Sequence, residues 1–328
     1  MPYAYNVGAV AAVKLFPQTK YFLFMNDDVV LSRDLIPILI EGLKSSSNAI
    51  QPIILHLDGH REVGFKIGIT GYVRPIEYKE ISGSAPLIRV PVIAGAALMI
   101  DRNVFFEVGM FDGDMFWGYD DVDFCWRLHK HGYTTCISTK AYVIHYGSAT
   151  WGKENPIRYH YGIQNHIYMF YKNHSFASAI VFTPLLLLEV LKVLCWRLRR
   201  RDSRGVKAIL SGVINGFRRI PCALKKGAFE PSKTPPKYLD PTVDLHLILG
   251  VSFYERFKRV RRARYWKFTK KIVRGLHWIV HDAYMVIKAP KVSVSSKIMS
   301  LLSYIIHHIL KINLSALRVF IDVDGNKL

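Results

Sequence analysis

The sequence predicts a layered domain of α/β or α+β class over residues 1–150, followed by a mostly helical, basic C-terminal region. Segments with strand and helix character alternate in the order β-α-β-β-α-β. The apolar run at residues 21–25 ends directly in a polar triplet, as buried strands of open α/β sheets do. A composition that is 50% hydrophobic and 21% charged excludes a disordered chain and a fibrous repeat.

The first elements follow from the spacing of apolar residues. Residues 21–25 predict a buried parallel strand, and residues 50–55 predict the next strand. Between them Ser32 can cap a helix whose apolar residues recur at every fourth position, although Pro37 weakens its first turn or delays its start. Residues 56–86 are rich in glycine and charge, which predicts a long excursion of short strands and loops.

The rest of this domain repeats the alternation. Three segments have strand character: residues 90–100, 134–137 and 141–144. Asp101 can cap a short helix that Gly109 ends. A second helix is predicted over residues 120–130, and Gly132 is placed to terminate it.

Charge separates this domain from the remainder of the chain. The 328 residues carry 45 Lys and Arg against 25 Asp and Glu, a net charge of +20. Residues 1–150 hold 13 basic and 15 acidic side chains, so the basic excess, 32 against 10, falls entirely on residues 151–328. We expect a division into residues 1–175, a docking region at 176–230 and a basic helical region at 231–328.

Residues 185–196 are apolar nearly all round and precede the basic run 197–201. Thr183 and Pro184 predict the start of this helix. Its length is short for a bilayer span, and Glu189 and Lys192 add a further cost. A helix that lies in the membrane plane or is shallowly inserted is therefore favoured over a spanning helix and over a buried core helix.

Three further segments follow: a proline-rich linker at residues 231–241, a cationic block at 256–271 and a helical apolar stripe at 298–309. Aromatic residues alternate with Arg and Lys in the cationic block, which suits nucleic acid or anionic lipid. Because an apolar helix flanked by Arg lies in the same region, an anionic membrane surface is the expected partner and nucleic acid is not.

No C-x-x-C pair occurs among the four cysteines, Cys125, Cys136, Cys195 and Cys222. A zinc knuckle or a disulfide framework is therefore not expected, and a reducing cytosolic compartment fits best. Residues 1–13 lack the basic start and apolar run of a secretory signal. We expect the protein at the cytoplasmic face of the plasma membrane, peripheral or shallowly inserted.

Three polar groupings are candidates for chemistry. Asn26, Asp27 and Asp28 follow a strand, where hard oxygen ligands suit magnesium or manganese with a diphosphate; a solvated turn is the alternative. The carboxylates at residues 120–123 open a helix, either as charge caps or with one of them ionised for proton abstraction. His145 ends a strand, as a ligand or as a hydrogen-bonded structural residue.

Six segments stand in a fixed order that, taken together, is more specific than any one of them: FMNDDV at 24–29, AGAALMIDR at 94–102, VGMFD at 108–112, FWGYDDVDFCWRL at 116–128, HGY at 131–133 and AYVIH at 141–145. In this series the chain resembles the family 2 inverting glycosyltransferases of GT-A fold, and most of all their rhamnosyltransferase and galactofuranosyltransferase branch. The resemblance covers about residues 5–175 and implies a Rossmann-like mixed sheet flanked by helices. The basic C-terminal region also resembles the membrane-docking tails of that branch.

The resemblance implies a role for each matching residue. Asp121 would be the catalytic base, with Asp120 beside it, and Asp28 and His145 would hold the metal. Residues implied to bind the nucleotide sugar are Asn6, Gly8, Asn26, Asp27 and Asp28. Residues implied at the acceptor are Gly95, Ala96 and Trp117.

The implied activity is metal-dependent, inverting, hexosyltransferase-like transfer, with Mn²⁺ or Mg²⁺, from a nucleotide-diphosphate sugar to a lipid-linked or cell-envelope glycan acceptor. Two substitutions depart from the family: Asn26 replaces the first carboxylate of the D-x-D motif, and Asp120 replaces a Glu. The strand and helix units that hold the nucleotide base in the family have no counterpart in the resemblance. A truncated or misassigned start, a degenerate copy, or a partner that completes the pocket each accounts for this. The competing functions are a non-catalytic, membrane-associated remnant or subunit and a nucleic-acid-binding protein.

Overall fold

The computed structural model describes residues 2–45, 47–81, 83, 85–147, 155–227, 239–240 and 243–244. The chain forms two compact units: Met1–Ser175 with Leu185–Asp244, and Phe176–Pro184 with Leu245–Leu328. Of the second unit only Phe176–Pro184 is described. The cationic block at 256–271 and the stripe at 298–309 lie outside the described residues, as does the linker at 231–241 except for residues 239–240.

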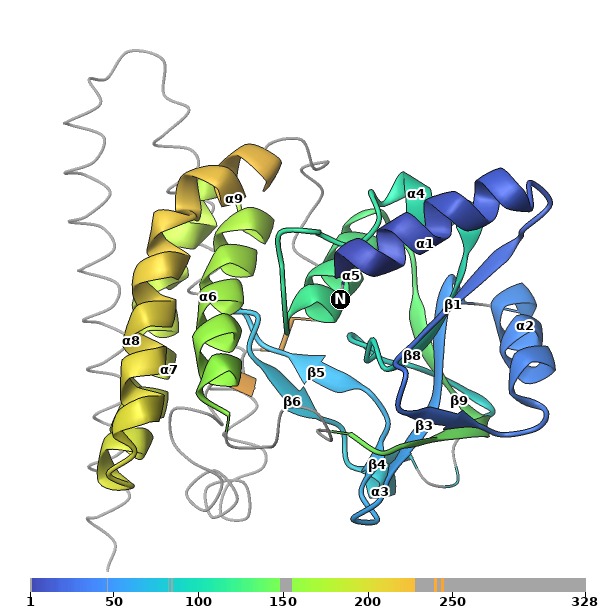
Figure 1. Cartoon of the computed structure of the whole chain (residues 1–328), viewed down its shortest axis with the longest axis horizontal. Helices are drawn as coiled ribbons and strands as arrows, with labels where there is room; N and C mark the ends of the chain where they lie inside the picture. Colours follow the sequence, from blue (N-terminus) through green and yellow to red (C-terminus); the bar gives the residue numbers. More distant parts are fainter. Residues whose placement is uncertain are drawn as a thin grey trace, which may run out of the picture. The chain divides into compact units, whose positions relative to one another are not determined.

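The described helices are α1 (Pro2–Leu15), α2 (Leu35–Ser45), α3 (Tyr78–Ile81), α4 (Arg102–Glu107), α5 (Asp120–Lys130), α6 (Pro156–Asn173), α7 (Phe176–Arg199), α8 (Ser203–Arg218) and α9 (Ile220–Gly227). The described strands are β1 (Tyr21–Met25), β2 (Val29–Leu31), β3 (Ala49–His56), β4 (Arg61–Glu62), β5 (Phe65–Ile67), β6 (Val73–Pro75), β7 (Leu87–Arg89), β8 (Ala97–Asp101) and β9 (Thr135–His145). Figure 1 shows their arrangement.

The main sheet has the strand order β1-β8-β3-β9-β2, with β4 paired to β3 and β7 paired to β9. Only the β3–β9 pair is parallel among the described pairs; the others are antiparallel, as is the separate two-stranded sheet of β5 and β6. The predicted α/β class is therefore confirmed as a mixed sheet flanked by helices.

Two apolar cores cover the two faces of this sheet, and alternate residues of each strand point to opposite faces. In β8, Leu98 and Ile100 join a core with side chains of α4 and α5. Ala97 and Met99 face the other core, which buries Leu35 of α2. Figure 1 shows α2 on one side of the strands and α1, α4 and α5 on the other.

The structure corrects three expected strands. β1 is buried only at alternate residues, Phe22 and Phe24, and it pairs antiparallel with β8 rather than parallel, because an apolar run does not specify strand direction. The strand predicted at 90–100 is reduced to β8, because residues 94–96 turn toward the site. The two short strands predicted at 134–137 and 141–144 form one strand, β9, whose pairing with β3 shifts register after Pro52, a residue without an N–H.

The helix predicted to start at Thr183 and Pro184 begins earlier, at Phe176, and α7 passes through Pro184. The Thr183 hydroxyl donates to the carbonyl of Ala179 at 2.6 Å instead of capping a helix start. Helix α1 was not expected either. It fully buries only Pro2 and Ala9, so its sequence carries no amphipathic pattern.

Candidate active site

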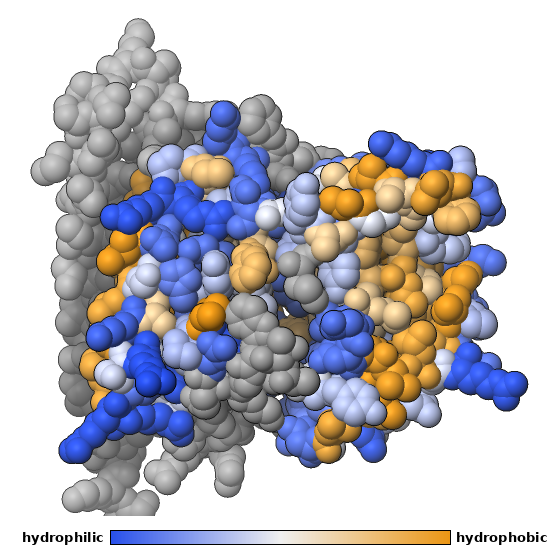
Figure 2. All heavy atoms as spheres, in the orientation of Figure 1, coloured by the Kyte–Doolittle hydropathy of each residue, from blue (hydrophilic) through white to orange (hydrophobic). Residues whose placement is uncertain are grey.

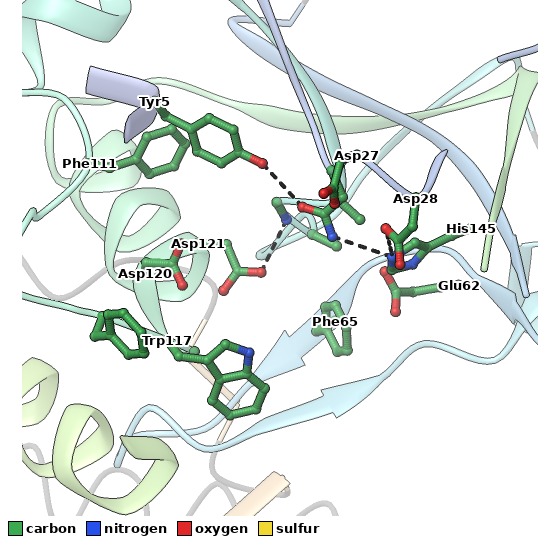
Figure 3. A pocket seen from close by; sticks show the side chains of 16 residues that line it. Tyr5, Asp27, Asp28, Glu62, Phe65, Phe111, Trp117, Asp120, Asp121 and His145 are labelled. Atoms are coloured by element: carbon green, nitrogen blue, oxygen red, sulfur yellow. Dashed lines mark hydrogen bonds and ion pairs between the residues drawn. The ribbon is translucent and has the colours of Figure 1, made fainter. Parts of the chain in front are cut away.

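A cavity of about 560 Å³ opens where β1, β8 and β9 meet the N-terminus of α5 (Figure 3). Its lining includes the predicted residues Asn26, Asp27, Asp28, Gly95, Ala96, Trp117, Asp120, Asp121 and His145. The structure does not bring Asn6 and Gly8 to this lining. The Asn6 amide instead donates to the Phe111 carbonyl at 2.8 Å and accepts from the Phe111 N–H at 3.1 Å, which ties α1 to the loop before α5.

Strand pairing places the nucleotide-sugar and acceptor candidates side by side. Met25 is paired with Ala97 at the end of β1, and the N–H of Asn26 continues the ladder by donating to the Ala96 carbonyl at 3.1 Å. The segments that follow β1 and precede β8 therefore leave the sheet together, into the cavity.

Asp28 and His145 meet because β2 pairs with β9. Val29 is paired with His145, and the N–H of Tyr146 donates to the Asp28 carbonyl at 3.0 Å. The His145 Nε2 and Asp28 Oδ1 atoms are 3.0 Å apart. The pairing that brings these two residues together is antiparallel.

The loop before α5 presents the acidic pair to the cavity. Tyr119, the N-cap residue, has a left-handed backbone with φ of 66°, and it follows Gly118 with φ of 74°. Asn165 of α6 holds this turn by donating to the carbonyls of Trp117 at 2.9 Å and Gly118 at 3.0 Å. A turn clamped in this strained form fixes the direction in which the first residues of α5 point.

Backbone donors orient the Asp121 carboxylate. Its Oδ2 accepts from the Gly95 N–H at 3.2 Å, and its Oδ1 accepts from the Val122 N–H at 2.8 Å. Burial raises the pKa of Asp121 despite these two bonds. Burial, together with the neighbouring Asp121 charge, raises the pKa of Asp120 to about 7. Such a pair is suited to exchange a proton near neutral pH.

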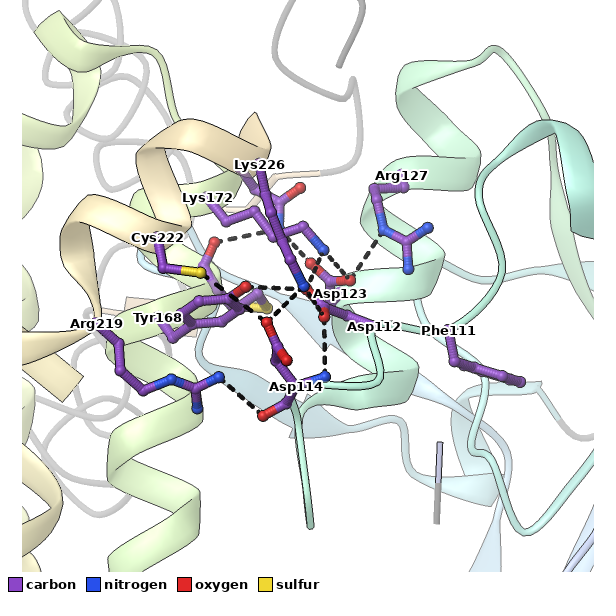
Figure 4. A network of polar contacts seen from close by, with 12 residues as sticks. Phe111, Asp112, Asp114, Asp123, Arg127, Tyr168, Lys172, Arg219, Cys222 and Lys226 are labelled. Atoms are coloured by element: carbon purple, nitrogen blue, oxygen red, sulfur yellow. Dashed lines mark hydrogen bonds and ion pairs between the residues drawn. The ribbon is translucent and has the colours of Figure 1, made fainter. Parts of the chain in front are cut away.

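Asp123 follows Asp121 by two residues in α5. Its side chain faces away from the cavity into a buried ion network (Figure 4). It accepts from the Arg127 Nε at 2.9 Å and from the Lys172 Nζ at 2.9 Å. Lys172 also donates to Asp112 at 2.8 Å, and Asp112 accepts from Lys226 at 2.6 Å. Asp123 is therefore a structural residue that joins α5 to α6.

Several lining residues were not predicted: Tyr5, Glu62, Phe65, Phe111 and Phe116. Tyr5 belongs to the unexpected helix α1, and Glu62 to the two-residue strand β4. Phe65 reaches the site through an isolated pairing with Val92, a contact between distant segments. Phe111 and Phe116 lie within two of the six ordered motifs, whereas Tyr5, Glu62 and Phe65 carry no local sequence signal.

The charge of the cavity bears on the implied metal. Its lining holds five carboxylates and no Lys or Arg side chain among the described residues: Asp27, Asp28, Glu62, Asp120 and Asp121. Within the described part of the chain, no group of three or more His, Cys, Asp and Glu side chains is arranged to hold a metal ion. A magnesium-type ion needs only one or two protein carboxylates and takes its other ligands from water and substrate phosphates. The donor pair Asp28 and His145 fits such an ion.

Comparison with known proteins gives limited information. No protein-family model matches the chain. Uncharacterised proteins of Mycobacterium bovis and Mycobacterium tuberculosis are 26% identical to it over 152 residues, 44% of this chain. The chain spans about half the length, 53%, of the curated relatives it matches.

Among solved structures, a crystal structure of GalNAc-T7 with UDP, GalNAc and Mn²⁺ aligns with a TM-score of 0.44 and 13% identity, covering 71% of this chain and 45% of that chain. A likeness of this size decides neither fold family nor function. The α/β class therefore rests on the sheet itself, and the GT-A assignment stays a prediction.

Proposed function

We propose that the protein is a metal-dependent, inverting glycosyltransferase of GT-A type that uses a nucleotide-diphosphate sugar. One observation carries the proposal: a single cavity gathers the pair Asp28 and His145 and the pair Asp120 and Asp121, which the sequence separates widely. The ordered motifs that predicted these residues support the same activity.

The donor diphosphate would lie beside Asp28 and His145. An anionic group does not enter a cavity lined by carboxylates unless a cation accompanies it. A divalent ion bound there, Mn²⁺ or Mg²⁺, would neutralise the diphosphate and stabilise it as a leaving group. Asp28 and His145 would hold that ion on the protein side.

Asp121 would act as the general base. The N–H groups of Gly95 and Val122 hold its carboxylate in one orientation in the cavity, where the acceptor hydroxyl would bind. As the acceptor oxygen bonds to the anomeric carbon, the bond from that carbon to the diphosphate breaks and the diphosphate leaves with the electron pair. Asp121 takes the hydroxyl proton, and a single displacement inverts the anomeric configuration.

The acceptor would enter past the aromatic side of the cavity. Trp117, Phe65 and Phe116 line this side, and their flat apolar faces suit the C–H face of a sugar ring. Gly95 and Ala96 leave room next to Asp121. We propose a glycan or a lipid-linked glycan of the cell envelope as this acceptor.

Docking to the cytoplasmic face of the plasma membrane completes the proposal. Within the described residues one helical segment, Ser178–Arg199, is long and apolar enough to cross a membrane, and 33% of it is buried; a single such helix does not establish a span. Glu189 faces inward, where both carboxylate oxygens contact the Thr70 hydroxyl at 2.8–2.9 Å. Burial, together with Asp244, raises the pKa of Glu189 to about 9, so this position places no charge on the outer face.

Titration calorimetry with Mn²⁺ and a panel of nucleoside diphosphates tests the donor site. We expect the metal to strengthen nucleotide binding, and Asp28→Ala to abolish that effect. Asp34→Ala removes an exposed carboxylate outside the cavity and serves as the control. Equal metal-dependent binding in Asp28→Ala would refute the assignment, whereas nucleotide-sugar binding without turnover would favour the non-catalytic subunit.

A further inference from the structure

An anionic ligand in this cavity needs hydrogen-bond donors as well as a cation. The described lining contains no Lys or Arg, so the donors must come from neutral groups. Asn26 is well placed to supply one, because it lines the cavity beside Asp28 and carries an amide with two N–H donors.

Tyr5 controls which end of the Asn26 amide faces His145 (Figure 3). The Tyr5 hydroxyl donates its single proton in a bond shared between the Asn26 Oδ1 atom at 3.1 Å and the Met25 carbonyl at 3.0 Å. The Asn26 Nδ2 atom lies 3.3 Å from the His145 Nε2 atom. The oxygen and the nitrogen of the Asn26 amide point in opposite directions. When the Tyr5 hydroxyl binds the amide oxygen, the amide nitrogen therefore points toward His145 and the cavity.

The hydroxyl itself is fixed in place. The Tyr5 ring packs against Phe24 at 5.3 Å and Phe111 at 5.8 Å between centroids. Both hydrogen bonds between Asn6 and Phe111 anchor the same turn of α1. Burial, with the nearby Asp120 carboxylate, raises the pKa of Tyr5 to about 12, so the group keeps its proton as a donor.

We propose that Tyr5 is a positioning residue that holds the Asn26 amide so that its N–H donates to the diphosphate of the ligand. In this arrangement Asn26 recognises the anion directly and leaves the metal to Asp28 and His145. The inference rests on the proposed function, because it assumes a diphosphate in this cavity.

Calorimetry with inorganic pyrophosphate in the presence of Mn²⁺ tests the inference on the whole chain. We expect Asn26→Ala to weaken pyrophosphate binding about 10-fold and Tyr5→Phe about 2- to 10-fold. In the Asn26→Ala background, Tyr5→Phe should have no further effect on pyrophosphate binding, because the other acceptor of the Tyr5 hydroxyl, the Met25 carbonyl, belongs to a residue outside the cavity lining. Affinity for Mn²⁺ alone should stay within about 2-fold in both variants.

Tyr3→Phe is the matched control, since Tyr3 lies on the same helix and is 71% exposed. Thermal unfolding of each variant separates misfolding from lost binding; Phe at position 5 keeps the ring packing. Additive losses in the double variant, an unchanged affinity in Tyr5→Phe, or a weakened affinity for Mn²⁺ alone would overturn the inference while leaving the proposed function intact. Failure of the parent protein to bind pyrophosphate with Mn²⁺ would overturn both.

Discussion

Three carboxylates within one turn of α5 have opposite surroundings. Asp120 and Asp121 face the cavity, and burial raises the pKa of each. Burial acts in the same direction on Asp123, but Lys172 and Arg127 outweigh it and lower its pKa. Two residues along a helix correspond to a rotation of about 200°, so Asp121 faces the cavity while Asp123 faces the buried ion network.

Asp121→Asn should abolish sugar transfer and leave donor binding nearly unchanged, because the amide keeps the shape but cannot accept the proton. The expected loss in kcat is about 10²–10⁴-fold. Initial rates and nucleotide-sugar affinity, measured on the same preparation, check this, with Asp34→Asn as the control. Near-normal turnover in Asp121→Asn would show that another group is the base.

The pH dependence of kcat/KM should have an acid limb above the usual range of a carboxyl group, because burial raises the pKa of Asp121 and the base must be ionised before it can accept a proton. Asp120→Asn removes the neighbouring charge and should move this limb to lower pH. The raised pKa of Asp120 also affects the free energy of unfolding. Its contribution to stability is fully present below about pH 4 and is lost as the pH rises through about 7. An acid limb that stays in place in Asp120→Asn would contradict the coupling.

The sequence predicts most of the polar residues that line the cavity, because they stand at strand ends and at a helix N-terminus. Asn26, Asp28 and His145 each follow an apolar run. Tyr5 and Glu62 could not be predicted, because only tertiary packing brings them to the cavity. The resemblance assigns Asn6 to the nucleotide sugar, but its side chain binds the Phe111 carbonyl in the loop before α5.

Among the elements, α5 and α6 are joined by the buried ion network. Burial raises the pKa of Asp112, but Lys172 and Lys226 outweigh it, so that this pKa lies well below its usual range. Stability from Asp112 and Asp123 is therefore present above about pH 4 and lost as the pH falls below it.

Lys172→Met should destabilise the fold by about 3–5 kcal/mol, because it leaves two buried carboxylates short of a partner. Lys226→Met is the matched variant: it also contacts Asp112, but its side chain is 39% exposed, and it should cost at most about 1 kcal/mol. Urea unfolding at neutral pH measures both. Equal losses would mean that exposure does not set the strength of these pairs.

Helix α8 packs closely on α6 at two glycines. A Cβ at Gly212 would lie 2.5 Å from the His160 carbonyl oxygen, and one at Gly216 would lie 2.9 Å from the Ile167 side chain. Gly212→Ala should cost about 1–3 kcal/mol, since backbone must move. Gly162→Ala meets nothing within 4 Å and should instead stabilise by about 0.5–1 kcal/mol. Opposite signs in thermal unfolding are the expected result; stabilisation by both substitutions would contradict the close packing.

Elements with strong local patterns were predicted closely. Helix α5 has the bounds expected from its acidic start and from Gly132, and α4 has the expected cap, with Asp101 accepting from the N–H groups of Asn103 and Val104. Strand direction was not predictable, because β1 pairs with a strand far along the chain. The start of α7 was misjudged because Thr183 and Pro184 carry the pattern of a cap while the helix passes through both.

On the scale of the whole molecule, apolar and basic side chains gather on the C-terminal helices. The large exposed apolar residues of α7 and α8 are Ile180, Leu187, Leu188, Leu191, Trp196, Leu198, Leu210 and Ile214. Figure 2 shows apolar spheres among hydrophilic ones along the left side of the coloured atoms, where these helices lie. Arg199, Arg200 and Arg204 follow the apolar part of α7.

We expect flotation with anionic liposomes, weakened but not abolished by salt, because apolar insertion adds to about 1 kcal/mol of attraction per basic residue. Leu188→Gln with Leu191→Gln should make release at high salt complete. Leu57→Gln, at a residue 66% exposed on another surface, is the control. Absence of binding at low salt would remove the membrane from the proposal.

The position of His145 at the end of β9 has a consequence for biosynthesis. A growing chain carries Asp28 long before His145 has been added, and the two meet only after β9 has paired with β3 and β2. Pairing between strands so distant along the chain closes late in folding. Under the proposed function, capture of the metal would therefore coincide with the completion of the sheet, since a nascent chain released before β9 is made has no His145 to offer the ion.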